Sequence, residues 1–375
     1  MFPGSVLSFR RAMRASPSFR KIATPGAGPK SARFIAVLSA ILCLGSLPAQ
    51  QTAADPWDGL PREKAAGLQI EWRSGDATRS KAGPAEVQAE TPVTLTVTGT
   101  KPGDEVRWWQ IIPDTRNFYK NANHPWDPDP YKWIGFAKIP CVKRELAACR
   151  GRAQAEVWPG KNAEPSLPHP LAFADGGFFY HTDCGSFWFQ VEVKRDGRVL
   201  RSPGLEESGE KGMSPRVFRL SVRKRDGFLG VLTSYCNVPG LFGCVPWQSY
   251  HYVGVDCADV LMAAACRCKG VELKRDWNVA MIVDQWPKAA ELELSAGKFS
   301  RDLKWGRDVK PGNLVAVRYA GGKIYQHIGA LMGDTNGNGI LDAADTIIHA
   351  GPEALQISDF TSGSFDGHLV IIRNE

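Results

Sequence analysis

The segment Gly254-Val-Asp-Cys-Ala-Asp-Val-Leu-Met-Ala-Ala-Ala-Cys-Arg-Cys-Lys-Gly270 decides the fold of the C-terminal half of this chain. Apolar residues recur along it at helical spacing, and Gly270 is a typical residue to end a helix. Asp256 is a good N-cap, and Asp259 resembles the acidic half of a capping box. The pattern predicts a helix over residues 257–269 whose first turn carries Cys257.

Short β-prone runs follow this helix. A helical stretch near residues 279–286 precedes them, and the predicted strands are residues 313–319, 326–332, 346–350 and 368–372. One principal helix followed by a small antiparallel sheet predicts an α+β domain.

The N-terminal half has a different pattern. Residues 92–99 and 186–193 alternate in polarity, Asp196-Gly197 is a hairpin turn signal, and residues 105–112, 198–202 and 217–222 complete a set of short strands. These strands predict an antiparallel β-sandwich, immunoglobulin-like at the level of a fold analogy. Residues 113–177 are a Pro-, Asn- and Trp-rich insertion. It is either a loop-rich elaboration or a loop that contacts substrate.

Residues 1–50 are typical of a leader for export. Basic residues precede the apolar run 34–47 and small residues follow it, which are the three regions of a secretory signal. An organelle transit peptide is the alternative, although such peptides lack a compact apolar block. We predict an exported protein (periplasmic, cell-surface or secreted) with no stable membrane span once the signal is removed.

Composition limits the classes of partner. The 375 residues are 43% hydrophobic and 23% charged, which excludes collagen-like, coiled-coil and wholly disordered chains. Of 46 Lys and Arg residues, seven lie in the leader, and the remaining 39 balance the 39 Asp and Glu. The net charge of +7 therefore gives no argument for a nucleic-acid partner.

The cysteines and histidines outside the leader allow several interpretations. In an exported protein, Cys141 with Cys149, and Cys236 with Cys244, are plausible local disulfides, although spacing does not prove connectivity. His124, His169 and His181 are interpreted as solvated or structural, because no neighbouring Cys or carboxylate spacing indicates a metal site. Trp126 and Trp133 are interpreted as packed side chains, with stacking on a sugar as the alternative.

Cys257, His327 and His349 form a candidate catalytic set. A cysteine in the first turn of a helix faces unsatisfied N–H groups and the positive end of the helix dipole, and both stabilise a thiolate. His327 and His349 lie on successive predicted strands, so antiparallel pairing can bring their imidazoles to one face of the sheet. A thiol nucleophile needs a base, and the base needs a group that orients it. A buried core cysteine is the alternative for Cys257.

The segments around these residues resemble the NlpC-type cysteine peptidases, whose fold is papain-like. The resemblance covers residues 230–375, and the segments that carry it are 245–248, 254–260, 309–315, 326–333 and 347–351. It implies that Cys257 attacks an amide carbonyl, that His327 takes and returns the proton, and that His349 orients His327. The chain departs from the family pattern at Ala258-Asp259 and Asn313, and the first change predicts a different cleft wall at Asp259.

Residues 334–345 match a calcium-binding loop of the dockerin type. Oxygen side chains stand at loop positions 1, 3, 5, 9 and 12, Gly339 stands at position 6, and position 7 offers a backbone carbonyl. The predicted ligands are Asp334, Asn336, Asn338, Ile340, Asp342 and Asp345. An Asn-Gly-rich hairpin turn without metal is the alternative. We predict a structural Ca²⁺, and no cohesin docking because only one repeat is visible.

The predicted fold class is an all-β immunoglobulin-like sandwich followed by an α+β papain-like domain. The ranges are a leader at 1–50, a linker at 51–65, the sandwich at 66–225 and the papain-like domain at 226–375. The predicted function is a cysteine hydrolase that cleaves amide bonds in a peptide or cell-wall substrate. Two alternatives remain: an amidase or acyltransferase with the same triad, and a non-catalytic surface-binding protein. The sequence leaves the oligomeric state open.

Overall fold

The computed structural model describes residues 55–75, 77, 80–157 and 181–374, and residues 55–375 belong to one compact unit. The predicted leader, the start of the predicted linker and His169 lie outside the described residues. Within the predicted linker, Trp57 is buried and residues 62–64 form a strand. No helix in the described part of the chain is both long enough and apolar enough to cross a bilayer.

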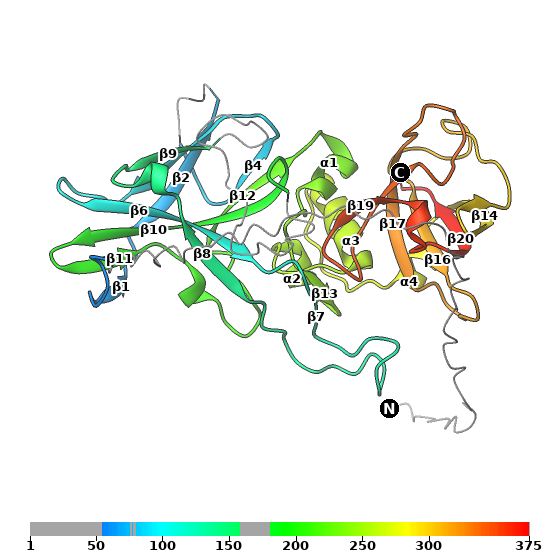
Figure 1. The fold of residues 1–375 in the computed structure, drawn as a ribbon, viewed down its shortest axis with the longest axis horizontal. Coiled ribbons are helices and arrows are strands. Elements are labelled where there is room, and N and C mark those ends of the chain that lie inside the picture. Colours follow the sequence, from blue (N-terminus) through cyan, green and yellow to red (C-terminus); the bar gives the residue numbers. More distant parts are fainter. Residues whose placement is uncertain (1–54, 76, 78–79, 158–180, 375) are drawn as a thin grey trace, which may run out of the picture. The chain divides into compact units, whose positions relative to one another are not determined.

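Two sheets form the N-terminal region (Figure 1). The first has the order β1-β11-β10-β12-β4, with β6 against β10 and β8 against β6. The second has the order β3-β2-β5-β9. The strands of the first are β1 (Arg62–Lys64), β4 (Ala85–Gln88), β6 (Glu105–Pro113), β8 (Cys141–Glu145), β10 (Gly185–Arg195), β11 (Arg198–Arg201) and β12 (Phe218–Arg223). Those of the second are β2 (Gln69–Ser74), β3 (Lys81–Ala82), β5 (Val93–Thr98) and β9 (Gln154–Val157).

A shared apolar core holds these two sheets together. Strand β5 buries every second residue, and its inward side chains pack in one cluster with Trp108 of β6 and Phe189 of β10. The hairpin predicted at Asp196-Gly197 is confirmed, since both residues have positive φ and join β10 to β11. Not every pairing is antiparallel as predicted, because β1–β11 and β4–β12 run parallel.

The C-terminal region contains short helices and a third, seven-stranded sheet. The helices are α1 (Gly227–Thr233), α2 (Pro246–Tyr250), α3 (Cys257–Cys268) and α4 (Val279–Gln285). The sheet order is β15-β14-β20-β16-β17-β18-β19, from β14 (Lys288–Ser295), β15 (Lys298–Phe299), β16 (Leu314–Arg318), β17 (His327–Gly333), β18 (Thr346–His349), β19 (Gln356–Asp359) and β20 (Gly367–Ile372). Helix α3 lies against β17, and its apolar side chains share a core with Ile111 and Trp188 of the first sheet.

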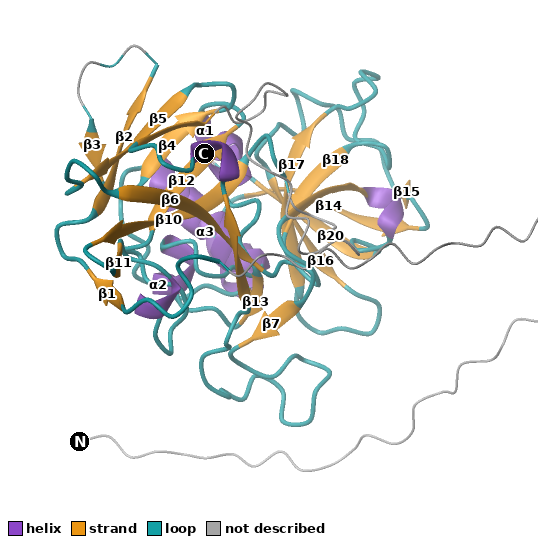
Figure 2. Cartoon of the chain, turned by 60° about the vertical axis from the view of Figure 1, so that its left-hand side comes forward, coloured by secondary structure: helices purple, strands orange, loops and turns teal. Residues whose placement is uncertain are grey.

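The predicted α+β papain-like fold class is wrong. The structure is mostly β, with 38% strand and 14% helix, and strands predominate throughout Figure 2. The helix predicted at 257–269 is present, but α1, α2 and α4 have only five to seven residues each. The third sheet is also larger than predicted, because β14, β15 and β19 were not expected.

The predicted insertion contributes strands to the fold. Its residues Phe118–Lys120 form β7, which pairs in parallel with β13 (Gly240–Phe242) of the C-terminal region. Leu241 of β13 donates its N–H to the carbonyl of Val255, two residues before Cys257. The insertion is therefore attached beside the start of α3. The sulfur atoms of Cys141 and Cys149, and of Cys236 and Cys244, are not bonded in the structure.

Candidate functional site

Cys257 is the first residue of α3. The carboxylate of Asp256 accepts hydrogen bonds from the N–H groups of Ala258 (3.1 Å) and Asp259 (2.9 Å), as predicted for an N-cap. The cap accepts from Ala258 and Asp259 and not from the N–H of Cys257 itself. The sequence thus places a half-buried thiol and a helix N-terminus at one point.

The surroundings of Cys257 favour a protonated thiol at rest. Burial and the nearby Asp256 raise its pKa, while hydrogen bonding from the N–H of Ile328 opposes the rise. Burial also raises the pKa of Tyr319 to about 12, and the neighbouring Cys257 adds to that shift. The sulfur therefore lies beside the backbone of β17, and Tyr319 is close enough to interact with it electrostatically.

His327 and His349 meet as predicted. Nε2 of His327 lies 3.0 Å from Nδ1 of His349, in hydrogen-bonding geometry. Gly329 pairs with His349 across the two strands, and a Cβ at Gly329 would lie 3.0 Å from the Cβ of His349 and 2.9 Å from the carbonyl of Ile348. Only glycine fits this crowded crossing, so Gly329 gives His349 the room to reach His327.

The histidine pair extends to a third polar residue. Nε2 of His349 lies 2.9 Å from Oγ of Ser358 on β19. The ring of Phe365 covers both imidazoles, with centroid distances of 5.0 Å to His327 and 5.3 Å to His349. The result is a chain from His327 through His349 to Ser358, shielded from solvent on one side by an aromatic ring.

Both imidazoles are held in the neutral form. Burial first, and the neighbouring His349 second, lower the pKa of His327 to about 3, and burial lowers the pKa of His349 to about 4. Neutral imidazoles keep a lone pair for proton acceptance over the whole physiological range. Together with the protonated thiol, they make the resting site uncharged at these three residues.

These pKa shifts predict acid destabilisation. Between pH 6.5 and about 4 the unfolded chain protonates both histidines and the folded chain does not, so stability falls as the pH falls, by up to about 1.4 kcal/mol per unit for each group. Asp256, whose pKa burial raises to about 6, acts in the opposite direction there. We expect the unfolding free energy of a His327→Gln/His349→Gln double variant to change less between pH 7 and acidic pH than that of the wild type. Parallel curves for the two proteins in urea titrations at pH 7 and pH 4.5 would contradict this.

The structure brings the predicted catalytic residues together only in part. Among the described residues no hydrogen bond joins Cys257 to His327, and the thiol instead meets the N–H of the next residue, Ile328. Hydrogen bonds of catalytic residues often tighten only when substrate binds. The different cleft wall predicted at Asp259 does not involve its side chain, because that side chain is fully buried and accepts a hydrogen bond from the Cys244 thiol at 3.1 Å.

An aromatic group from the insertion lies next to His327. A Cβ on Gly351 would lie 3.5 Å from Cζ of Phe118 and 3.9 Å from Cε1 of His327, so Phe118 and the imidazole flank the same glycine. His124 stacks on Trp126 at 4.6 Å and on Phe118 at 5.8 Å. Trp126 is 73% exposed, contrary to the expectation that it packs internally. We call residues 118–134 the aromatic loop.

The predicted calcium loop connects β17 to β18. The carboxylate of Asp334 accepts from the N–H groups of Gly337 and Gly339, both at 2.8 Å. The side-chain amides of Asn336 and Asn338 both donate to Asp342. Oxygens at loop positions 1 and 9 therefore already serve as acceptors inside the loop.

Asp345, at position 12 of the loop, is fully buried. Its carboxylate accepts three hydrogen bonds, from the N–H of Thr335 (2.8 Å), the N–H of Asp342 (3.0 Å) and the indole of Trp305 (2.9 Å). Its carboxylate thus ties both ends of the loop to the segment at Trp305.

Among the residues that the structure describes, two groups of His, Cys and acidic residues have ligand atoms within 4.8 Å of one another, and the calcium loop is not one of them. The first is Cys244, Asp256 and Asp259, in which Asp256 caps α3 and the Cys244 thiol donates to one oxygen of Asp259, while the other oxygen of Asp259 has no partner. The second is His181, Cys184 and Cys236. The sequence interpretation missed this group, although the spacing His181-Thr-Asp-Cys184 was a signal for it.

Ser358, Tyr319 and Phe118 also escaped the sequence interpretation, because no motif marks them. Each reaches the site from a segment remote in sequence from Cys257. No family model, curated protein or solved structure matches the chain.

Proposed function

We propose that this protein is an exported cysteine hydrolase that cleaves amide bonds with Cys257 as nucleophile, His327 as base and His349 as the group that orients the base. The observation that carries the proposal is the 3.0 Å contact between His327 and His349 beside a thiol at a helix N-terminus. The resemblance of the surrounding motifs to NlpC-type peptidases supports amide chemistry.

The positions of the protons on the two imidazoles support one order of proton transfer. With Nε2–H of His327 donating to Nδ1 of His349, the other nitrogen of His327 keeps its lone pair. The neutral thiol passes its proton to that nitrogen as the sulfur attacks the carbonyl carbon. His327 then returns the proton to the leaving amine, and water releases the acyl group from sulfur.

The start of α3 supplies the oxyanion donor in this proposal. The N–H of Cys257 is not taken by the Asp256 cap, and in this proposal it donates to the negative oxygen of the tetrahedral intermediate. The helix dipole adds to this stabilisation. Because the resting site is uncharged, charge develops only as the substrate reacts.

The aromatic loop is proposed as one wall of the substrate site. Trp126 is held by stacking on His124 rather than by burial, and Phe118 links the loop to the glycine beside His327. An exposed and oriented indole can stack on a flat apolar group or on a sugar ring of a cell-wall substrate or a similar substrate. Loss of such a contact affects substrate binding without changing the reacting groups.

Trp126→Ala is therefore expected to raise KM by roughly 2- to 10-fold and to leave kcat nearly unchanged, since one aromatic contact contributes about 0.5–1.5 kcal/mol. Val271→Ala is the control, because Val271 is also 49% exposed and lies outside the aromatic loop. Steady-state kinetics on one cleaved peptide measure both variants. Equal KM values in the wild type and Trp126→Ala would remove the aromatic loop from the substrate site.

Ca²⁺ is proposed as a structural ion in the loop 334–345. The loop joins the strands that carry His327 and His349, so its conformation sets the register in which the imidazoles meet. Three carboxylates in one short loop repel each other, and a divalent cation cancels that repulsion. The ion stays remote from the reacting atoms in this proposal.

The direct experiment incubates the mature protein with peptidoglycan stem peptides and with simple protein substrates, and identifies products by mass. A gain of one water at a specific amide supports a hydrolase, whereas transfer of the acyl group to an added amine identifies an acyltransferase. If neither panel yields a product and the protein binds a wall polymer instead, the non-catalytic alternative replaces the proposal.

A further inference from the structure

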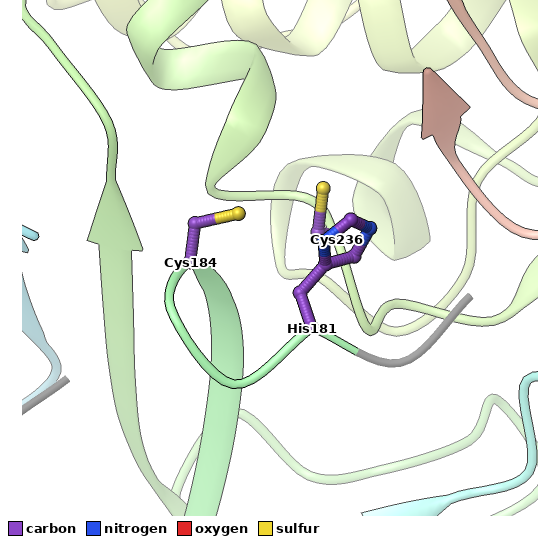
Figure 3. A group of neighbouring side chains, drawn as sticks. All are labelled: His181, Cys184 and Cys236. Atoms are coloured by element: carbon purple, nitrogen blue, oxygen red, sulfur yellow. The ribbon is translucent and has the colours of Figure 1, made fainter. Parts of the chain in front are cut away.

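A second cluster of reactive side chains lies outside the candidate catalytic site. Figure 3 shows the side chains of His181, Cys184 and Cys236 grouped together, and one ligand atom from each lies within 4.8 Å of the others. Both cysteines are fully buried, and the His181 side chain is 26% exposed. The three residues come from the loop that leads into β10 and from the turn after α1.

The backbone around this cluster is tightly built. The side chain of Asn237 accepts a hydrogen bond from the N–H of His181 (2.7 Å) and donates one to its carbonyl (2.9 Å). Gly185 has φ +102°, and a Cβ there would lie 2.4 Å from the carbonyl oxygen of Cys236. The same carbonyl accepts from the N–H of Ser186 at 2.8 Å. The two segments are therefore locked together with their three side chains converging.

The two sulfur atoms of the cluster lie in a buried environment. Hydrogen bonding with Cys236, and then burial, raise the pKa of Cys184, and the nearby His181 opposes that rise. A metal ion that binds here replaces the thiol protons, because the thiolate is the form that ligates metal. Lys224, paired with Asp183 at 3.0 Å, interacts electrostatically with the two thiols, but an ammonium group cannot coordinate sulfur.

We propose that His181, Cys184 and Cys236 bind one Zn²⁺ ion through an imidazole nitrogen and two thiolates, with water as the fourth ligand. Zn²⁺ prefers nitrogen and sulfur donors in a tetrahedral arrangement, whereas Ca²⁺ and Mg²⁺ prefer oxygen. Binding releases the two thiol protons to solvent and changes no oxidation state. The ion fastens the loop before β10 to the turn after α1, independently of the proposed hydrolase.

A Cys184–Cys236 disulfide is the competing use of the same sulfurs. Both thiols are free in the structure, and a disulfide would leave the converging imidazole with only Asp183, whose carboxylate lies 3.9 Å from Nδ1 of His181. Its formation would need a disulfide donor to accept two electrons and two protons. The three-ligand convergence therefore favours the metal.

Cobalt substitution tests the site in the full chain. The reduced, metal-stripped protein is titrated with Co²⁺, and we expect a thiolate-to-cobalt absorption band that saturates at one equivalent, disappears when Zn²⁺ is added and persists in excess Ca²⁺. Cys184→Ser and Cys236→Ser should lose the band and His181→Gln should weaken Co²⁺ binding, while Cys268→Ser, an exposed position, should keep it.

A measurement on the wild type covers the case in which these variants fail to fold. Zn²⁺ should protect Cys184 and Cys236 from alkylation in the reduced native chain, as read by peptide mapping. No cobalt band in the reduced wild type, or no protection by Zn²⁺, would overturn the proposal. A band that survives Cys184→Ser would also overturn it, as would a metal-free isolated protein that contains a Cys184–Cys236 disulfide.

Discussion

Replacing Cys257 by alanine is expected to lower the rate of amide cleavage by at least about 10⁴-fold, because removal of a covalent nucleophile leaves only the contribution of binding and of the oxyanion donor. The fold should survive. The Asp256 cap uses the N–H groups of Ala258 and Asp259, and neither is altered. Product formation and the melting temperature of the same preparations measure the two effects.

Two further variants sharpen this prediction. His327→Ala should be nearly as inactive as Cys257→Ala, while His349→Gln should lose less activity, because an amide side chain can still hold the base. Cys268→Ser is the control for a general effect of removing a thiol, since Cys268 is exposed at the other end of α3. A Cys257→Ala protein that retains the wild-type rate refutes the mechanism.

Asp345→Ala is expected to produce the largest loss of stability. The substitution strands three N–H donors at a fully buried position, and each unsatisfied donor costs about 1–3 kcal/mol, so the unfolding free energy should fall by about 3 kcal/mol or more. For a unit of this size the melting temperature should fall by roughly 5–10 °C even without metal. Calorimetry in the presence of a chelator measures this intrinsic part.

The calcium contribution is separated by comparison with Asp342→Ala. Asp342 is only half-buried, so its removal should cost less intrinsic stability while still removing a predicted ligand. Calcium should raise the melting temperature of the wild type but not of either variant. If calcium leaves the melting temperature of the wild type unchanged and elemental analysis finds no calcium, the loop is a turn without metal. Lost activity at an unchanged melting temperature would indicate a catalytic metal instead.

Much of the candidate site could be predicted from local sequence. The helix that starts at Cys257 follows from its cap and its apolar spacing, and both were confirmed. The meeting of His327 with His349 follows from their places on adjacent strands, since side chains two residues apart on a strand share a face. The first feature is local in sequence, and the second depends only on the pairing of two strands that follow one another in the chain.

The fold class could not be predicted, because tertiary contacts outweigh local propensity. Strand β14 has the sequence Lys-Ala-Ala-Glu-Leu-Glu-Leu-Ser, in which most residues favour helices. Pairing with β20 nevertheless makes it a strand that buries Ala290, Leu292 and Leu294. The residues of strand β19 do not alternate in burial, so no sequence pattern indicated that Ser358 belongs to the site. The cluster at His181 is formed by two segments that are far apart in sequence, so the spacing of residues could not predict that they meet.

Alkylation of Cys257 in the active protein tests the central claim most directly. Native protein is treated with iodoacetamide for increasing times at several pH values, and each sample is assayed for amide cleavage and mapped for modified cysteines. Because its thiol is protonated at rest, Cys257 should react faster as the pH rises, and the remaining activity should match the fraction of Cys257 left unmodified. Unchanged cleavage after complete modification of Cys257 would contradict the account.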